Sequence, residues 1–124
     1  MAIQKVLIVD DSPTERYYLT TMLERNGFTV TTAENGEDAM AKIRADRPEL
    51  ILMDVVMPGA NGFQVTRAIA RDPELADVPV IICSTKNQET DRIWGMRQGA
   101  RDYLVKPVKP GDLLDKIAAL AALG

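Results

Sequence analysis

The sequence predicts an α/β protein in which a parallel sheet is covered by helices on both faces. Short apolar runs such as Val6–Val9 and Leu50–Met53 recur along the chain, without the polar alternation of a half-exposed strand. Stretches with the apolar spacing of a helix separate these runs, and this alternation implies right-handed βαβ units. The 124 residues suffice for one core. We therefore expect a single doubly wound domain over residues 1–124, with no output domain after it.

Each strand is predicted from a short, mainly apolar run followed by a polar or charged residue at which the run stops. Runs of this kind are typical of strands that lie inside a parallel sheet. We expect five of them, near Val6–Val9, Thr29–Ala33, Leu50–Met53, Val80–Cys83 and Tyr103–Val105.

The helices are predicted from apolar spacing together with their start and stop signals. Ser12 is suited to cap the first helix, with Pro13 at its first position and Asn26-Gly27 at its end. Pro48 and Pro73 mark where the second and third helices have stopped. We expect helices from Ser12 to about Asn26, from Asn35-Gly36 to before Pro48, from about Gly62 to Arg71, from about Gln88 to Gly99, and from Gly111-Asp112 through Leu120.

Composition excludes several classes of function. The net charge of −3 argues against a nucleic-acid-binding surface, and no run approaches the ~20 apolar residues of a membrane span. The only cysteine, Cys83, cannot form an internal disulfide and is expected to be buried. We therefore expect a cytoplasmic protein without membrane insertion. The absence of histidine excludes histidine acid–base chemistry, histidine metal sites and self-phosphorylation on histidine.

Four polar or charged positions follow four of the predicted strands: Asp10-Asp11, Asp54, Ser84 and Lys106. Ligands of parallel sheets bind outside the carboxyl ends of the strands, so these side chains are expected to converge. Taken singly, each is also typical of a turn, a helix cap or a surface position. Together they provide three carboxylates, one hydroxyl and one ammonium, a set that suits a divalent cation and a phosphoryl group.

The carboxylates predict a cation site and a nucleophile. Two carboxylates about 4 Å apart repel by ~4 kcal/mol at an effective dielectric constant near 20, and a divalent ion removes that cost. Asp54 is suited to accept a phosphoryl group as a carboxylate nucleophile. The Lys106 ammonium is suited to pair with phosphoryl oxygens, and a cis peptide bond before Pro107 is one way of aiming it.

Considered together, these residues resemble the receiver domain of bacterial two-component response regulators. The matching pattern runs in order along the chain from Lys5 to about Leu120, and it consists of Asp10-Asp11, Asp54 with Met57-Pro58 and Asn61-Gly62, Ser84, and Lys106-Pro107. The resemblance implies a flavodoxin-like (βα)5 sheet with strand order 2-1-3-4-5, flanked by five helices.

The resemblance also implies the chemistry of the site. Asp54 would take a phosphoryl group from a phosphohistidine on a sensor histidine kinase or phosphotransfer protein. Asp11 and Asp54 would bind Mg²⁺ directly, together with the backbone carbonyl of Val56, whereas Asp10 would act through a bound water. Mn²⁺ would substitute for Mg²⁺. The chain would catalyse only its own phosphotransfer and autodephosphorylation, as a signalling protein rather than an enzyme acting on other substrates.

Other positions are implied to read the phosphorylated state. Ser84 and Lys106 would contact the phosphoryl group, and Tyr103 matches the switch aromatic that swings inward when Ser84 moves toward the phosphate. The change would reach a downstream protein target through the face formed by the fourth helix, the fifth strand and the fifth helix. Val56 and Lys86 flank the path of the attacking water and would set the dephosphorylation rate.

Within the family, the segment from Cys83 to Asp91, with Trp94-Gly95 and Gln98-Gly99-Ala100, resembles stand-alone receivers of chemotaxis-like systems that control type IV pilus twitching motility. Such a receiver would be a monomer or a weak, phosphorylation-linked dimer. The segment also contains the only tryptophan. The commoner expectation for Trp94 is packing in the core, and the alternative is a partner surface.

Several alternatives remain to be weighed. An aspartyl phosphatase of the haloacid dehalogenase type places an acid two residues after the nucleophile, but that position holds Val56. A nucleotide-binding protein needs a glycine-rich loop, which is absent. A phosphorylation-independent adaptor, or a phosphate sink, with the same fold stays open. The apolar segment from Ile117 to Leu123 is expected to form the core face of the last helix rather than a membrane anchor.

Overall fold

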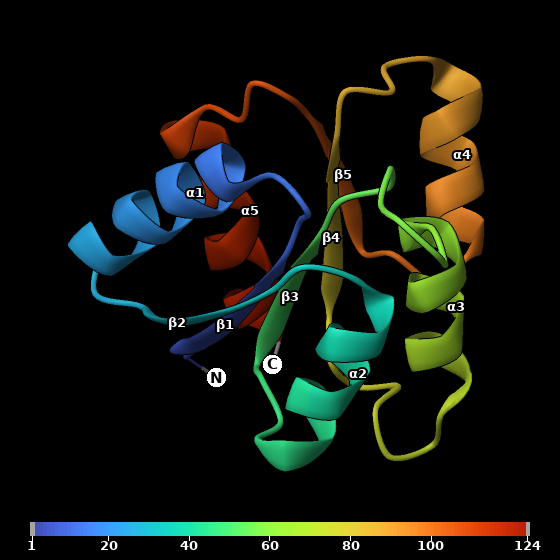
Figure 1. Cartoon of the computed structure of the whole chain (residues 1–124). Coiled ribbons are helices and arrows are strands. Elements are labelled where there is room, and N and C mark those ends of the chain that lie inside the picture. The colour runs from blue at the N-terminus through green and yellow to red at the C-terminus, as the bar shows by residue number, and fades with distance from the viewer. Residues whose placement is uncertain (1, 124) are drawn as a thin grey trace.

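The computed structural model, which describes residues 2–123, shows a parallel sheet with helices on both faces (Figure 1). Within these residues the sheet has five strands in the order β2-β1-β3-β4-β5, which confirms the predicted topology. The strands are β1 (Lys5–Val9), β2 (Thr29–Ala33), β3 (Leu50–Met53), β4 (Val80–Ser84) and β5 (Asp102–Val105). The helices are α1 (Pro13–Arg25), α2 (Gly36–Ala45), α3 (Gly62–Arg71), α4 (Glu89–Arg97) and α5 (Pro110–Leu123).

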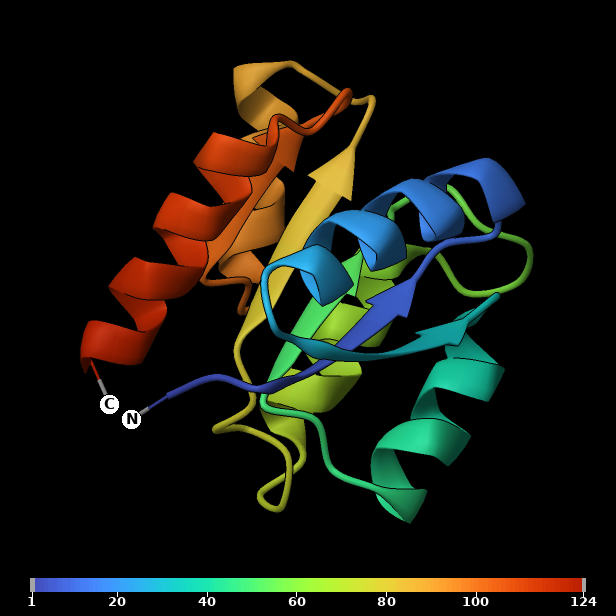
Figure 2. The same ribbon diagram turned by 90° about the vertical axis from the view of Figure 1, so that its left-hand side faces the viewer.

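Two apolar cores lie on opposite faces of the sheet because successive side chains of a strand point to opposite sides. In β1, Leu7 and Val9 belong to the core beneath α2, α3 and α4, whereas Val6 and Ile8 belong to the core beneath α1 and α5. Figure 2 shows α1 and α5 in front of the sheet, with α2, α3 and α4 behind it. Both faces of the inner strands are therefore buried, as the uninterrupted apolar runs predict.

The helix starts follow from side-chain capping. The Ser12 side chain accepts a hydrogen bond from the Glu15 backbone N–H at 3.3 Å, and Pro13 is the first helical residue of α1. Asn61 and Gln64 form a reciprocal capping box at the start of α3. Each cap satisfies backbone donors that would otherwise lack partners, and this explains why local sequence alone located these starts closely.

The structure corrects one expectation and refines two others. Trp94 is 49% exposed on α4, so its predicted packing in the core is wrong. Cys83 is buried, as predicted. In the last helix Ile117 lies in the core, but Leu123 is exposed, so the apolar C-terminal run forms the core face only in part. Among residues 2–123, no helix combines the length and apolar character needed to cross a membrane.

Candidate functional site

The carboxyl ends of β1 and β3 bring two aspartates together. The strands are parallel neighbours, with Val9 opposite Met53, and each is followed by an aspartate. The Asp10 backbone N–H donates to the Ala33 carbonyl at 3.0 Å, and the Asp54 backbone N–H donates to the Val9 carbonyl at 2.9 Å. The sheet ladder thus continues through both residues and fixes their backbones at one edge, where the loops before α1, α3, α4 and α5 meet (Figure 1).

Three carboxylates converge at this edge. Asp10, Asp11 and Asp54 each offer an oxygen, and these atoms lie within 4.8 Å of one another. Asp10 and Asp54 are buried, whereas Asp11 is exposed to solvent. Hard carboxylate oxygens at this separation, with one side open to water, fit a magnesium ion that keeps some of its waters. The structure therefore brings Asp54 next to the adjacent acids Asp10 and Asp11, from which it is distant in the sequence.

The Lys106 ammonium is inserted between the two buried acids. Its Nζ lies 2.7 Å from Asp10 Oδ2 and 3.3 Å from Asp54 Oδ1, and the lysine side chain is only 10% exposed. Burial by itself lowers the pKa of Lys106, but the hydrogen bond to Asp10 and the charges of Asp54 and Asp10 outweigh it, so the pKa is raised. The Lys106–Pro107 peptide bond is cis. With its pKa raised, Lys106 carries a positive charge in the site at neutral pH.

Asp54 differs from Asp10 in how its charge is supported. Asp10 accepts a second hydrogen bond from the Ser12 backbone N–H at 2.9 Å. Burial raises the pKa of Asp54, the neighbouring Asp10 charge raises it further, and Lys106 only partly compensates. Asp54 is thus a carboxylate whose negative charge is incompletely stabilised, as befits a nucleophile beside a cation site.

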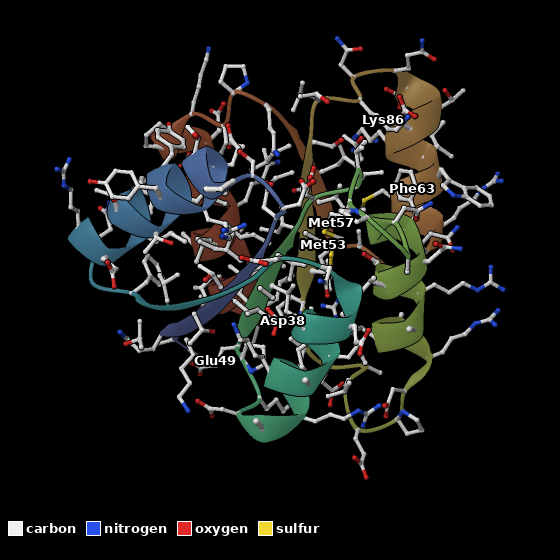
Figure 3. The ribbon with its side chains drawn as sticks, viewed as in Figure 1. Asp38, Glu49, Met53, Met57, Phe63 and Lys86 are labelled. Atoms are coloured by element: carbon white, nitrogen blue, oxygen red, sulfur yellow. The ribbon has the colours of Figure 1, made fainter. Side chains whose placement is uncertain are left out.

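A short chain of hydrogen bonds links Ser84 to Tyr103 through the backbone of Lys86. The Lys86 N–H donates to Ser84 Oγ at 3.1 Å, and the Tyr103 hydroxyl donates to the Lys86 carbonyl at 2.8 Å. Ser84 is completely buried, and the Tyr103 ring lies inward. Figure 3 shows Lys86 in the loop above the start of α4. The inward swing of Tyr103 stays a prediction, but this loop physically connects the two proposed switch residues.

The residues expected to flank the attacking water lie at the mouth of the site. The Val56 side chain is 59% exposed, and Lys86 is exposed as well. The Lys86 ammonium forms no salt bridge with another residue of the 2–123 segment. Their effect on dephosphorylation, and the Val56 carbonyl as a metal ligand, stay predictions.

The sequence reasoning missed Arg16 and gave Gly62 no role beyond the Asn61-Gly62 motif and the start of a helix. Arg16 donates from its guanidinium to the Asp10 carbonyl at 2.8 Å, which braces the loop after β1. A Cβ atom at Gly62 would lie 1.9 Å from the Asp54 carbonyl oxygen, so only glycine lets α3 start this close to the phosphoacceptor candidate. The Asn61-Gly62 pair was a visible signal for the turn, whereas nothing local marked Arg16.

Comparisons with known proteins agree with this geometry. Residues 6–118 match the family model of the response regulator receiver domain. The chain is 58% identical over 118 residues to protein PilH of Pseudomonas aeruginosa, covering 95% of this chain and 98% of PilH. It is 35% identical over 116 residues to the DNA-binding response regulator MtrA of Mycolicibacterium smegmatis; there the match covers 94% of this chain but only 50% of MtrA.

Solved structures show the same fold. A putative response regulator from Chloroflexus aurantiacus superposes with a TM-score of 0.92 at 29% identity, covering 97% of this chain and 98% of that one. Chemotaxis protein CheY4 of Vibrio cholerae superposes with a TM-score of 0.88 at 33% identity, covering 96% and 99%. Family match, topology and the acidic site all coincide, and the chain belongs to the response regulator receiver domain family.

Proposed function

We propose that this chain is a phosphorylation-controlled signalling receiver whose phosphoacceptor is Asp54. Receiver domains are phosphorylated by histidine kinases and act on downstream targets. The observation that carries the proposal is the placement of Asp54: it is buried, has a raised pKa, lies beside two further carboxylates and is 3.3 Å from the Lys106 ammonium. This arrangement combines a nucleophile with one ammonium group and with carboxylates that could hold a cation, and positive charge of this kind stabilises a transferring phosphoryl group.

The phosphotransfer step is a nucleophilic substitution at phosphorus. A carboxylate oxygen of Asp54 attacks the phosphorus of a phosphohistidine on a sensor kinase or phosphotransfer protein. An O–P bond forms, the P–N bond breaks, and its electron pair stays on the imidazole nitrogen. In autodephosphorylation, water attacks the same phosphorus, and the products are inorganic phosphate and the Asp54 carboxylate. Val56 and Lys86, at the mouth of the site, would influence the access of that water.

The acidic cluster would hold Mg²⁺ through Asp11, Asp54 and the Val56 carbonyl, with Asp10 acting through water and Mn²⁺ as a substitute. The fit rests on three carboxylates whose oxygens lie within 4.8 Å and on the charge of Asp54, which its neighbours compensate only in part. When bound, the ion supplies positive charge to the transferring phosphoryl oxygens. Lys106 supplies a second positive charge, 3.3 Å from Asp54 Oδ1.

The phosphoryl group would switch the protein through Ser84 and Tyr103. Lys106 and the Ser84 hydroxyl can each donate a charge-assisted hydrogen bond to phosphoryl oxygens, worth ~1.5–3 kcal/mol apiece. Reversing a two-state equilibrium from 1:99 to 99:1 takes ~5.5 kcal/mol, which two or three such contacts approach. If Ser84 turns toward the phosphate, its bond from the Lys86 N–H is released, and the Tyr103 bond to the same peptide segment changes with it.

The signal would leave through the face formed by α4, β5 and α5 toward a protein target. The similarity to PilH and the segment from Cys83 to Asp91 support a role in a type IV pilus motility system of chemotaxis-like organisation. We place the chain in the cytoplasm, where its kinase would act, as a monomer or a weak phosphorylation-linked dimer. The alternative, an adaptor or phosphate sink with the same fold, predicts no change in partner binding on phosphorylation.

Intact mass spectrometry tests the proposal directly. Incubation with acetyl phosphate should add one phosphoryl group in the presence of Mg²⁺, and Asp54→Ala should abolish this gain. Asp46→Ala is a matched control, because Asp46 forms an exposed ion pair remote from the site. A gain that persists in Asp54→Ala would refute the assigned residue. Absence of any gain, both from acetyl phosphate and from a phosphorylated histidine kinase, would favour the adaptor.

A further inference from the structure

A hollow between α3 and α4 lies outside the phosphoacceptor site. It has a volume of about 360 Å³, and its walls are formed by Arg67, Ala70 and Arg71 of α3 together with Trp94, Arg97 and Gln98 at the end of α4. The two helices pack side by side on the face of the sheet opposite α1 and α5 (Figure 1). The hollow lies along the later turns of both helices, whereas Lys86 lies in the loop between β4 and α4 (Figure 3).

The charge of this hollow is opposite to that of the whole chain. Three of its residues, Arg67, Arg71 and Arg97, carry guanidinium groups, and no carboxylate forms part of its wall. None of the three forms an ion pair with a carboxylate in the described 2–123 range. Arg67 and Arg71 are spaced i, i+4 on one helix, where like charges are unfavourable. Because the whole chain has a net charge of −3, its composition does not explain this local excess of positive charge.

Carboxylates on or next to α3 and α4 have other partners. Asp72, next to Arg71, pairs with Arg44 at 3.2 Å and accepts a hydrogen bond from the Glu74 backbone N–H. Glu89, at the start of α4, pairs with Arg92. By contrast, a second hollow of about 520 Å³ near the start of β3 mixes arginines with carboxylates, including Arg47, Arg101, Glu49 and Asp77. Of these two hollows, only the one between α3 and α4 therefore has no carboxylate in its wall to compensate the charge of its arginines.

Trp94 supplies an apolar surface beside the arginines. Its side chain is 49% exposed, although its neighbour Gly95 is buried against the sheet. A Cβ atom at Gly95 would lie 2.8 Å from Ile82 Cδ1 and 3.2 Å from Tyr103 Cδ2, so glycine lets α4 approach the sheet closely. Because Gly95 occupies the inward position, the next residue back, Trp94, faces outward. Tryptophan and arginine are the residues most enriched at the energetic centres of protein interfaces.

We propose that the hollow between α3 and α4 docks an acidic segment of a partner protein, with carboxylates on Arg67, Arg71 and Arg97 and an apolar side chain against Trp94. Guanidinium groups bind carboxylates in a bidentate manner, and unpaired arginines on two helices can engage several carboxylates along one chain. The surface shares α4 with the α4–β5–α5 face through which the phosphorylation signal would leave, but its other wall is α3 rather than β5 and α5, and binding there does not require phosphorylation.

The backbone around the hollow favours a protein segment over a nucleotide. Phosphate sites usually offer several free backbone N–H groups. Here the Gln98 N–H donates to the Trp94 and Gly95 carbonyls, and the Gly99 N–H donates to the Met96 carbonyl. The donors that remain are side-chain guanidinium groups on separate turns, which suits carboxylates that are spaced along a peptide.

The single tryptophan makes the test direct, because all tryptophan emission comes from Trp94. The probe is a short synthetic peptide of aspartate and glutamate around two leucines, compared with its asparagine–glutamine counterpart. We expect the acidic peptide to shift Trp94 emission and the backbone amide resonances of α3 and α4, with weaker binding at higher salt. Reversing two charges in Arg67→Glu/Arg71→Glu should weaken binding by about tenfold or more.

The matched control is Arg47→Glu/Arg101→Glu, which reverses two arginines of the other hollow and should leave the affinity unchanged. Thermal unfolding of both variants checks that they fold. Asp54→Asn should also bind the acidic peptide, so this test stands or falls independently of the phosphoacceptor assignment. The proposal is overturned if the acidic peptide causes no shift, if the neutral peptide binds equally well, or if GMP or ATP binds in the hollow and the acidic peptide does not.

Discussion

The two ends of β3 hold two carboxylates in opposite electrostatic situations. Glu49 precedes the strand, and its Oε1 accepts hydrogen bonds from the backbone N–H groups of Lys5 and Gln4, both at 2.9 Å (Figure 3 shows Glu49). The hydrogen bond from Lys5 and then that from Gln4 lower the pKa of Glu49. At the other end, burial and then the charge of Asp10 raise the pKa of Asp54.

The difference separates an acid that the fold stabilises from the acid that we propose as the phosphoacceptor. The fold supplies Glu49 with donors at the amino ends of the strands, so its charge stabilises the native state. Asp54 lies where the carboxyl ends of the strands meet and has Asp10 as a neighbouring acid, so its negative charge has a cost that a cation can relieve. Variants that remove a charge at either end of β3 therefore test this contrast.

Removing the internal cation should have the largest effect. Lys106→Met leaves Asp10 and Asp54 buried without their ammonium partner and should lower the free energy of unfolding by about 3 kcal/mol, as for other broken buried ion pairs. Urea denaturation without magnesium measures it. Lys116→Met is the matched control, because the Lys116–Asp102 pair is more exposed and such pairs contribute about 1 kcal/mol or less. Equal losses of unfolding free energy in Lys106→Met and Lys116→Met would show that the buried pairs of Lys106 contribute no more than the exposed pair of Lys116.

Magnesium should stabilise the protein only by binding the carboxylates at the carboxyl end of β3. At ten times its dissociation constant, a ligand bound only by the native state adds about 1.4 kcal/mol. Asp11→Asn should reduce this gain, because Asp11 is the exposed member of the carboxylate cluster. Glu49→Gln should keep it in full. Thermal midpoints with and without MgCl₂, or after chelation, measure the effect, and an unchanged magnesium response in Asp11→Asn would contradict the proposed ligand set.

Neutralising Asp54, the proposed phosphoacceptor, should stabilise the metal-free protein. Asp54→Asn removes a charge that burial and Asp10 oppose, and it should raise the free energy of unfolding by about 0.5–2 kcal/mol, the range of single stabilising substitutions. Asp46→Asn, which removes an acid from an exposed ion pair with Lys5, should give no such gain. A metal-free Asp54→Asn variant that is less stable than the wild type would show that pairing with Lys106 outweighs the repulsion.

Neutralising Glu49 should have the smallest and opposite effect. Glu49→Gln should lower stability at neutral pH by about 0.5 kcal/mol, since the partly exposed carboxylate is screened by solvent. The pKa of Glu49 is lowered in the folded state, so its contribution is present above the unfolded pKa near 4 and is lost as the pH falls through the folded pKa. Urea denaturation across this range should show the two proteins converging in acid, and a difference that persists there would have another origin.

Local patterns in the sequence determined the elements of this protein. Uninterrupted apolar runs specified buried strands, and residues such as Ser12 and Asn61 specified helix starts, because strand burial and capping involve neighbours a few positions away. The position of Asp10, Asp54 and Lys106 directly after strands was enough to predict that they meet, since parallel strands end at one edge of the sheet.

Only the tertiary structure decided the environments of individual side chains. The insertion of Lys106 between Asp10 and Asp54, and the link from Ser84 to Tyr103 through the Lys86 backbone, depend on atoms supplied by different strands. The exposure of Trp94, against expectation, and the unpaired arginines around it follow from how closely α4 approaches the sheet and α3. Charge, burial and exposure of this kind arise from packing between segments far apart in the chain, which no local pattern encodes.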